Sequence, residues 1–205
     1  MSAGFATTTA EYASLRNRAL EVFAMDSQGL PGSVFSPGFD SYRFIEFDVM
    51  LFPEFWDVLA SCAEGYGDDD VCLLAHEPDA EDYYFANFGR YGALSFPRGC
   101  SRRDYKKWLL QDPGNSPADA FQYNLSVGLW CGSSKEWGFW GDRDLGVGVG
   151  ATRNSEISWP SIEGIEWLDA RNALESLVAP NFDGAIIPIG FAKTFEATFG
   201  APRKH

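Results

Sequence analysis

Residues 121–151 read FQYNLSVGLWCGSSKEWGFWGDRDLGVGVGA, and this stretch decides the fold. It contains three apolar and aromatic runs, residues 121–130, 137–140 and 145–151, which are separated by turn-forming residues. Short runs joined by tight turns are typical of neighbouring antiparallel strands. The stretch therefore predicts three adjacent strands of one sheet.

Further strands are predicted upstream of this stretch. Residues 42–49 alternate apolar and acidic side chains, and residues 71–75 form a short apolar run. Residues 83–88 and 91–96 are predicted to form a hairpin, because Gly89 and Arg90 between them suit a tight turn.

Helices are predicted towards both ends of the chain. Residues 8–25 carry apolar side chains at helical spacing, and Thr8 and Glu11 form a capping-box pattern at the start. After residues 169–178, a last short strand is predicted at residues 186–189. The other predicted helices are short: residues 53–63, 102–111, 169–178 and 192–199.

Strands in the middle and helices at the ends predict an α+β protein with a largely antiparallel sheet. The length of 205 residues suits a single domain, residues 1–205. Turn formers crowd residues 112–117, which leaves a subdomain boundary there as an alternative.

Charge narrows the classes of partner. The chain has 29 acidic and 16 basic residues, and its net charge is −13. Such a field repels nucleic acid and anionic membranes, so neither is expected as a partner. The first residues lack the features of a signal peptide, and no apolar run is long enough to span a membrane. We expect a cytoplasmic protein, with a monomer favoured.

The inventory of reactive side chains is poor. The cysteines are spaced too widely for a common zinc motif and are expected to be reduced, mostly buried thiols. His76 is the one internal histidine, and an ordinary edge histidine is favoured over a catalytic one. The glycines at 146, 148 and 150 do not have nucleotide-binding spacing and favour close packing instead. No catalytic residue, metal or cofactor is predicted.

Acidic residues are concentrated in one segment. Twelve acids and no Lys or Arg lie between Arg43 and Arg90. Such a segment can steer a basic partner, although a solvated surface is an equal alternative. Neighbouring tyrosines could anchor an interface. The candidate partner-binding residues are Asp68, Asp69, Asp70, Glu77, Asp79, Glu81, Asp82, Tyr83 and Tyr84.

Two segments carry a resemblance to a known group of proteins. Residues 82–92 (DYYFANFGRYG) and residues 137–144 (WGFWGDRD) resemble parts of bacterial immunity proteins encoded beside polymorphic toxins. The tryptophans of the second segment are expected to pack in the core, and Arg143 to pair with a nearby Asp. The resemblance implies a non-enzymatic antitoxin that binds a cognate toxin in the cytosol.

Two other functions stay open. A small hydrolase working through two carboxylates on a sugar or nucleotide would need a cleft in which the carboxyl pKa values are raised. An assembly protein would need a large apolar interface in a symmetric oligomer.

Overall fold

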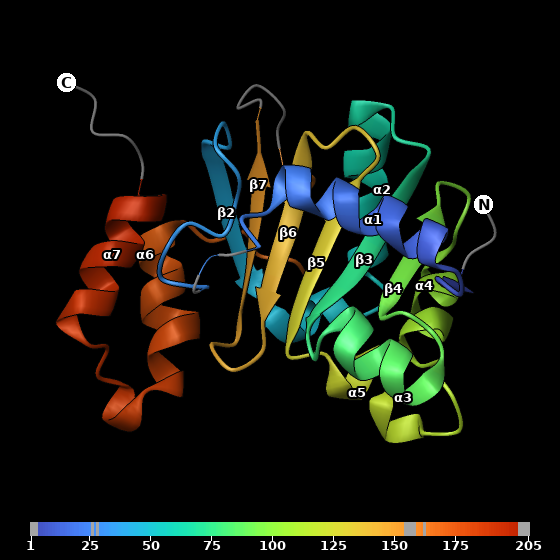
Figure 1. The fold of residues 1–205 in the computed structure, drawn as a ribbon. Coiled ribbons are helices and arrows are strands. Elements are labelled where there is room, and N and C mark those ends of the chain that lie inside the picture. Colours follow the sequence, from blue (N-terminus) through green and yellow to red (C-terminus); the bar gives the residue numbers. More distant parts are fainter. Residues whose placement is uncertain (1–3, 26, 28, 154–158, 162, 201–205) are drawn as a thin grey trace.

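A single antiparallel sheet of seven strands forms the centre of the molecule (Figure 1). The computed structural model describes residues 4–25, 27, 29–153, 159–161 and 163–200. The strand order is β1-β4-β3-β5-β6-β7-β2, and strands from both sides of residues 112–117 pair through β3 and β5. The strands are β1 (Gly4–Phe5), β2 (Ser41–Glu46), β3 (Asp70–Glu77), β4 (Ala93–Pro97), β5 (Val127–Gly132), β6 (Trp137–Asp142) and β7 (Val147–Thr152). The predicted α+β class is confirmed.

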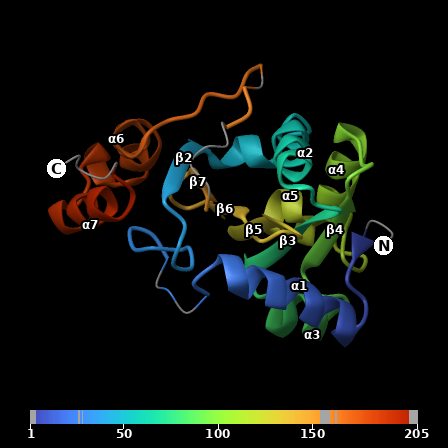
Figure 2. The ribbon, with the colours of Figure 1, turned by 90° about the horizontal axis from the view of Figure 1, so that it is seen from above.

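Helices cover both faces of the sheet. Figure 2 shows α1 and α3 on one side and α2 and α4 on the other, with α6 and α7 beyond β2. The helices are α1 (Thr9–Val22), α2 (Phe55–Tyr66), α3 (Ala86–Phe88), α4 (Arg102–Leu109), α5 (Phe121–Asn124), α6 (Ala170–Ala173) and α7 (Ile189–Phe199). Shorter helical turns are η1 (Phe47–Leu51), η2 (Ala80–Phe85), η3 (Pro117–Asp119), η4 (Leu174–Val178), η5 (Ala179–Asn181) and η6 (Asp183–Ala185).

Successive side chains of the central strands point to opposite faces of the sheet and pack into two separate cores. On β5, Leu129 packs into the core beneath α1, whereas Trp130 packs into the core beneath α2. The buried Trp130 indole donates a hydrogen bond to the Tyr105 hydroxyl, which donates to the carbonyl of Met50. Because both donors have acceptors, these hydrogen bonds offset the cost of burying the indole N–H and the hydroxyl.

The first helix begins where the sequence predicts. Thr8 and Glu11 form the expected capping box, with the Thr8 hydroxyl accepting from the Glu11 amide. The helix ends at Val22, three residues before the predicted end, because residue 23 turns into an extended conformation. Phe23 then bridges to Phe35 across the loop.

Four predicted strands are wrong in whole or in part. The strand predicted at residues 42–49 ends at Glu46, and residues 47–49 belong to the helical turn η1. Residues 80–88 are helical, because Asp79 caps the first turn and Tyr84 is buried on the helical repeat from Ala80. Residues 121–124 form a helical turn before β5, and residues 186–189 form no strand but lead into α7.

The predicted close packing against the glycine-rich strand is confirmed. A Cβ atom on Gly150 would lie 2.7 Å from the indole ring of Trp159 and 2.5 Å from the ring of Phe139. These approaches are too short for a methyl group, so glycine at this position lets two aromatic rings lie directly on β7.

The structure predicts a strong difference in thiol reactivity. All four cysteines are free; Cys62, Cys72 and Cys131 are buried, whereas Cys100 is partly exposed. Burial raises the pKa of Cys62 to about 12 and also raises that of Cys100, which keeps both thiols protonated at neutral pH and slows the reaction of the accessible Cys100. At pH 8 we expect one slow reaction with a thiol reagent in the native protein and four fast ones in denaturant. Loss of the native reaction in Cys100→Ser would confirm the assignment, and rapid reaction of several thiols would contradict it.

Candidate functional site

The predicted binding acids do not share one face. Asp68, Asp69 and Asp70 lie at the start of β3, whereas Glu77 and the acids that follow it lie at the other end. Seven residue steps along a strand separate Asp70 from Glu77 by about 23 Å. The acidic segment is therefore split into two sites of different character.

Asp68 is an interior residue, so its predicted role as a partner-binding residue is wrong. Its side chain is 1% exposed. The carboxylate accepts hydrogen bonds from the Trp137 indole at 2.7 Å, the Ser133 hydroxyl at 3.1 Å and the amide of Ser134. Asp68 therefore fixes the turn between β5 and β6 and is not available to a partner.

Asp70 is also bound by partners in the interior of the protein. It forms an ion pair with Arg18 of α1 at 3.0 Å, and both side chains are almost completely buried. The hydroxyl of Ser95 on β4 donates a second hydrogen bond to the carboxylate at 2.8 Å. Asp69 between them is exposed, because successive residues of an extended chain point to opposite sides.

The contrast between Asp68 and Asp69 gives a stability prediction. Asp68→Ala leaves the buried Trp137 indole without its acceptor, and we expect a loss of about 3 kcal/mol in the free energy of unfolding. Asp69→Ala, one residue further on, should change it by less than about 0.5 kcal/mol. Urea unfolding of the two variants compares them directly, and equal effects would contradict the structural role of Asp68.

The other group of acids is exposed. Glu77, Asp79, Glu81 and Asp82 are all exposed, and they lie where β3 ends and η2 begins. The Asp79 carboxylate also caps η2, accepting from the amides of Glu81 and Asp82 at 2.7 Å. This part of the predicted site is placed where a partner can reach it.

The two predicted tyrosine anchors differ. Tyr83 is half-buried, and its hydroxyl donates to Asp119. Tyr84 is completely buried, with its ring against Phe121 at 5.3 Å, so its expected role as an interface anchor is wrong. Its spacing from Ala80 places it on the inner side of η2.

Strand register adds acids that the sequence did not assign to the site. Glu77 pairs with Val127, which pairs with Asp142; Asp142 pairs with Val147, which pairs with Glu46. Directly opposed residues share a face, so β3, β6 and β2 each place an acid on the same face at the same end. Alternate strands lie about 10 Å apart, which spaces these carboxylates evenly. The acids Glu46, Glu77, Asp79, Glu81, Asp82, Asp142 and Asp144 are called the acidic end.

A cavity of 260 Å³ opens within the acidic end. Leu30 and Gly29 from the loop after α1 line one side, and strand residues line the other. The His76 ring lies against the Trp140 ring, with centroids 5.3 Å apart. The residues of this acidic cavity that carry chemistry are His76, Glu77, Trp140, Asp142 and Asp144.

Negative charge is uncompensated in the acidic cavity. Burial, then the charges of Asp144 and Glu77, raise the pKa of Asp142, although its hydrogen bond from the Leu145 amide acts in the opposite sense. The four ion pairs within the described part of the chain involve other acids. No lysine or arginine is among the described residues that line the cavity.

Arg143 lies beside these acids in the sequence but does not neutralise them. Its guanidinium donates to the carbonyls of Leu125, Tyr123 and Gln122 and lies over the Phe47 ring. The expected pairing of Arg143 with an Asp is therefore wrong. The expected burial of Trp137 and Trp140 is confirmed.

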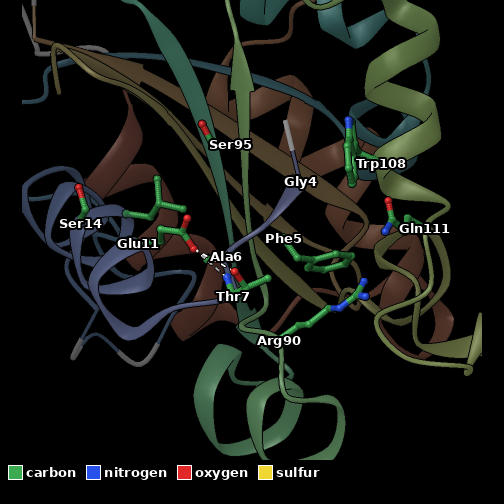
Figure 3. A pocket seen from close by; sticks show the side chains of 11 residues that line it. Gly4, Phe5, Ala6, Thr7, Glu11, Ser14, Arg90, Ser95, Trp108 and Gln111 are labelled. Carbon is green, nitrogen blue, oxygen red and sulfur yellow. Dashed lines mark hydrogen bonds between the residues drawn. The ribbon is translucent and has the colours of Figure 1, made fainter. Parts of the chain in front are cut away.

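A second cavity, of 420 Å³, lies at the β1 edge of the sheet (Figure 3). It is bounded by β1, α1 and α4, with Trp108 on one wall and Arg90 below Phe5. Its one acid, Glu11, is engaged by the amides of Thr7 and Thr8, and these bonds lower its pKa. This cavity offers no free carboxylate to a basic partner.

Comparison with protein-family models, with curated proteins and with solved structures found no match. Within the described ranges, no cluster of three or more His, Cys, Asp or Glu side chains could hold a metal ion. No helix of the described chain is long and apolar enough to cross a membrane.

The raised pKa of Asp142 gives a pH-dependent prediction. A carboxyl pKa above the ordinary 3.8 means that ionisation of Asp142 opposes folding. The stability of the folded protein is therefore highest while the carboxyl is protonated, and it falls as pH rises through the folded-state pKa. Asp142→Asn cannot ionise and should unfold at a higher temperature than the parent protein at pH 7. The gain should vanish towards pH 3.8, where the unfolded-state carboxyl protonates. Thermal unfolding at several pH values tests this, with Asp69→Asn as control; a destabilised Asp142→Asn at pH 7 would contradict it.

Proposed function

We propose that this protein is an immunity protein, which binds a bacterial toxin with basic groups at its active site and blocks it stoichiometrically. The observation that carries the proposal is the acidic end, where seven acids from different elements lie at one end of the sheet without an ion pair among the described residues. An uncompensated negative surface lowers stability and is expected where it serves a partner.

The chemistry of such a toxin follows from the charge. Enzymes that cleave nucleic acids or consume nucleotides hold phosphate with Lys and Arg, so their active sites are complementary to the acidic end. Such substrates lie in the cytosol, which is where the inhibitor would act. The half-buried Tyr83 and the exposed Phe85 of η2 add apolar contact area beside the acids.

The carboxylate hydrolase is the second candidate. It is favoured by one specific observation, the raised pKa of Asp142 in a cavity that also holds Glu77 and Asp144. The cavity volume of 260 Å³ is smaller than common substrate pockets, which favours the inhibitor. Turnover of a sugar or nucleotide that is abolished in Asp142→Asn would establish the hydrolase instead.

Charge reversal at the acidic end tests the inhibitor. Glu77 and Glu81 are exposed and make no ion pair, so replacing both by Lys should not disturb the fold. With the toxin encoded beside this gene, we expect association to slow by about tenfold and to lose part of its salt dependence. Stopped-flow or surface-plasmon measurements at two salt concentrations give both quantities.

The matched control has the same change in net charge at the other end of the sheet. Glu64 in the last turn of α2 and Asp69 before β3 are both exposed. Their double replacement by Lys should slow association far less than the change at the acidic end. Equal slowing by both pairs would mean that only net charge matters, and the absence of any complex with the toxin would refute the proposed function.

A further inference from the structure

We propose that the acidic cavity is a binding site for the guanidinium group of one arginine side chain, presented by the toxin. This inference rests on the proposed function and names the residue type at the centre of the interface. It concerns His76, Glu77, Trp140, Asp142 and Asp144, together with the loop residue Leu30.

Charge selects a cation. Three carboxylates from β3, β6 and the turn after β6 line the cavity, and no basic residue is among its described lining residues except His76. The raised pKa of Asp142 is the direct consequence of burial beside Asp144 and Glu77. A bound cation would relieve both the repulsion and the desolvation. An anionic or phosphate-bearing ligand is excluded by the same charges.

The unpartnered indole N–H of Trp140 favours a cation that also carries a hydrogen-bond acceptor. Trp140 is 2% exposed, lines the cavity, and its indole N–H has no hydrogen-bond partner in the described structure. A buried donor without an acceptor costs free energy, so a ligand oxygen that reaches it is favoured. An arginine residue supplies a cation for the carboxylates and, through its peptide carbonyl, an acceptor for the indole N–H.

Size and geometry favour arginine over the alternatives. The volume of 260 Å³ lies just below that of small-molecule pockets and suits one long side chain. The five N–H donors of a guanidinium can serve several carboxylates at once, whereas a lysine ammonium is a compact point charge. A multivalent metal ion is disfavoured, because the described side chains include no group arranged to hold one.

The test uses Nα-acetyl-arginine N-methylamide as the probe. Its titration into the full-length protein should shift the indole N–H resonance of Trp140 saturably in NMR spectra, with a dissociation constant in the millimolar range expected of a single-residue ligand. Trp140→Phe assigns the resonance. The citrulline analogue has nearly the same shape without the charge, and it should give at most a tenth of the affinity.

Variants separate the cavity from the general negative field. Asp144→Asn and Glu77→Gln should each weaken probe binding by about threefold to fivefold, the range of partly exposed charge pairs. Glu81→Gln removes a charge from η2 outside the cavity lining and should leave binding unchanged. No saturable shift of Trp140 up to about 100 mM probe would overturn the proposal. Equal binding of the citrulline analogue would also overturn it. Tighter binding of glucose, which represents the sugar substrate of the alternative hydrolase, would do the same.

Failure of this inference is distinguishable from failure of the proposed function. If the toxin binds the protein but the probe does not, the arginine site is wrong and the inhibitor stands. If the probe binds and no toxin does, the cavity recognises guanidinium but the inhibitor is wrong. Loss of toxin affinity in Asp144→Asn, together with loss of probe binding, supports both.

Discussion

The antiparallel register that links β3, β5, β6, β7 and β2 is the constraint on which the rest of the structure depends. One irregularity, between Ala75 and Glu77, brings Glu77 opposite Val127. Opposed residues share a face, so one register sends Leu129 and Trp140 under α1 and Trp130 and Phe139 under α2. The same register brings Glu77 and Asp142 to one end of the sheet. A slip by one residue would bury these acids on the wrong face and expose the core, so the core and the acidic end are specified together.

Sequence patterns predicted the elements that local physics decides. The capping box at Thr8 and the cap at Asp169 begin helices as expected, and the strands that became β3, β6 and β7 were found by their apolar runs. The patterns failed at residues 83–88, where aromatic residues suit a strand but also fit a helical repeat. There the Asp79 cap and the burial of Tyr84 decide for a helix, and neither can be weighed without the tertiary structure.

The site was only half accessible to sequence reasoning, because a run of acids does not show which carboxylates are free. Asp68 and Asp70 find buried partners in Trp137 and Arg18, which are far away in the chain. Glu77 and Glu81 find no partner of this kind. The contribution of Asp142 depends on register across three strands, and the only sequence signal was that an acid lies two residues after each of the predicted strands 71–75 and 137–140. Such a signal becomes meaningful once the strand order is known.

The acidic end also shows how stability and recognition compete within one small region. The turn after β6 contains a cation, Arg143, which could have neutralised Asp142 or Asp144. The guanidinium instead donates to the backbone carbonyls of Gln122, Tyr123 and Leu125, at the end of α5. The carboxylates next to it form no ion pair. Burial and the neighbouring charges therefore raise the pKa of Asp142. An arrangement that withholds an available cation from its own acids is expected to accept one from another molecule.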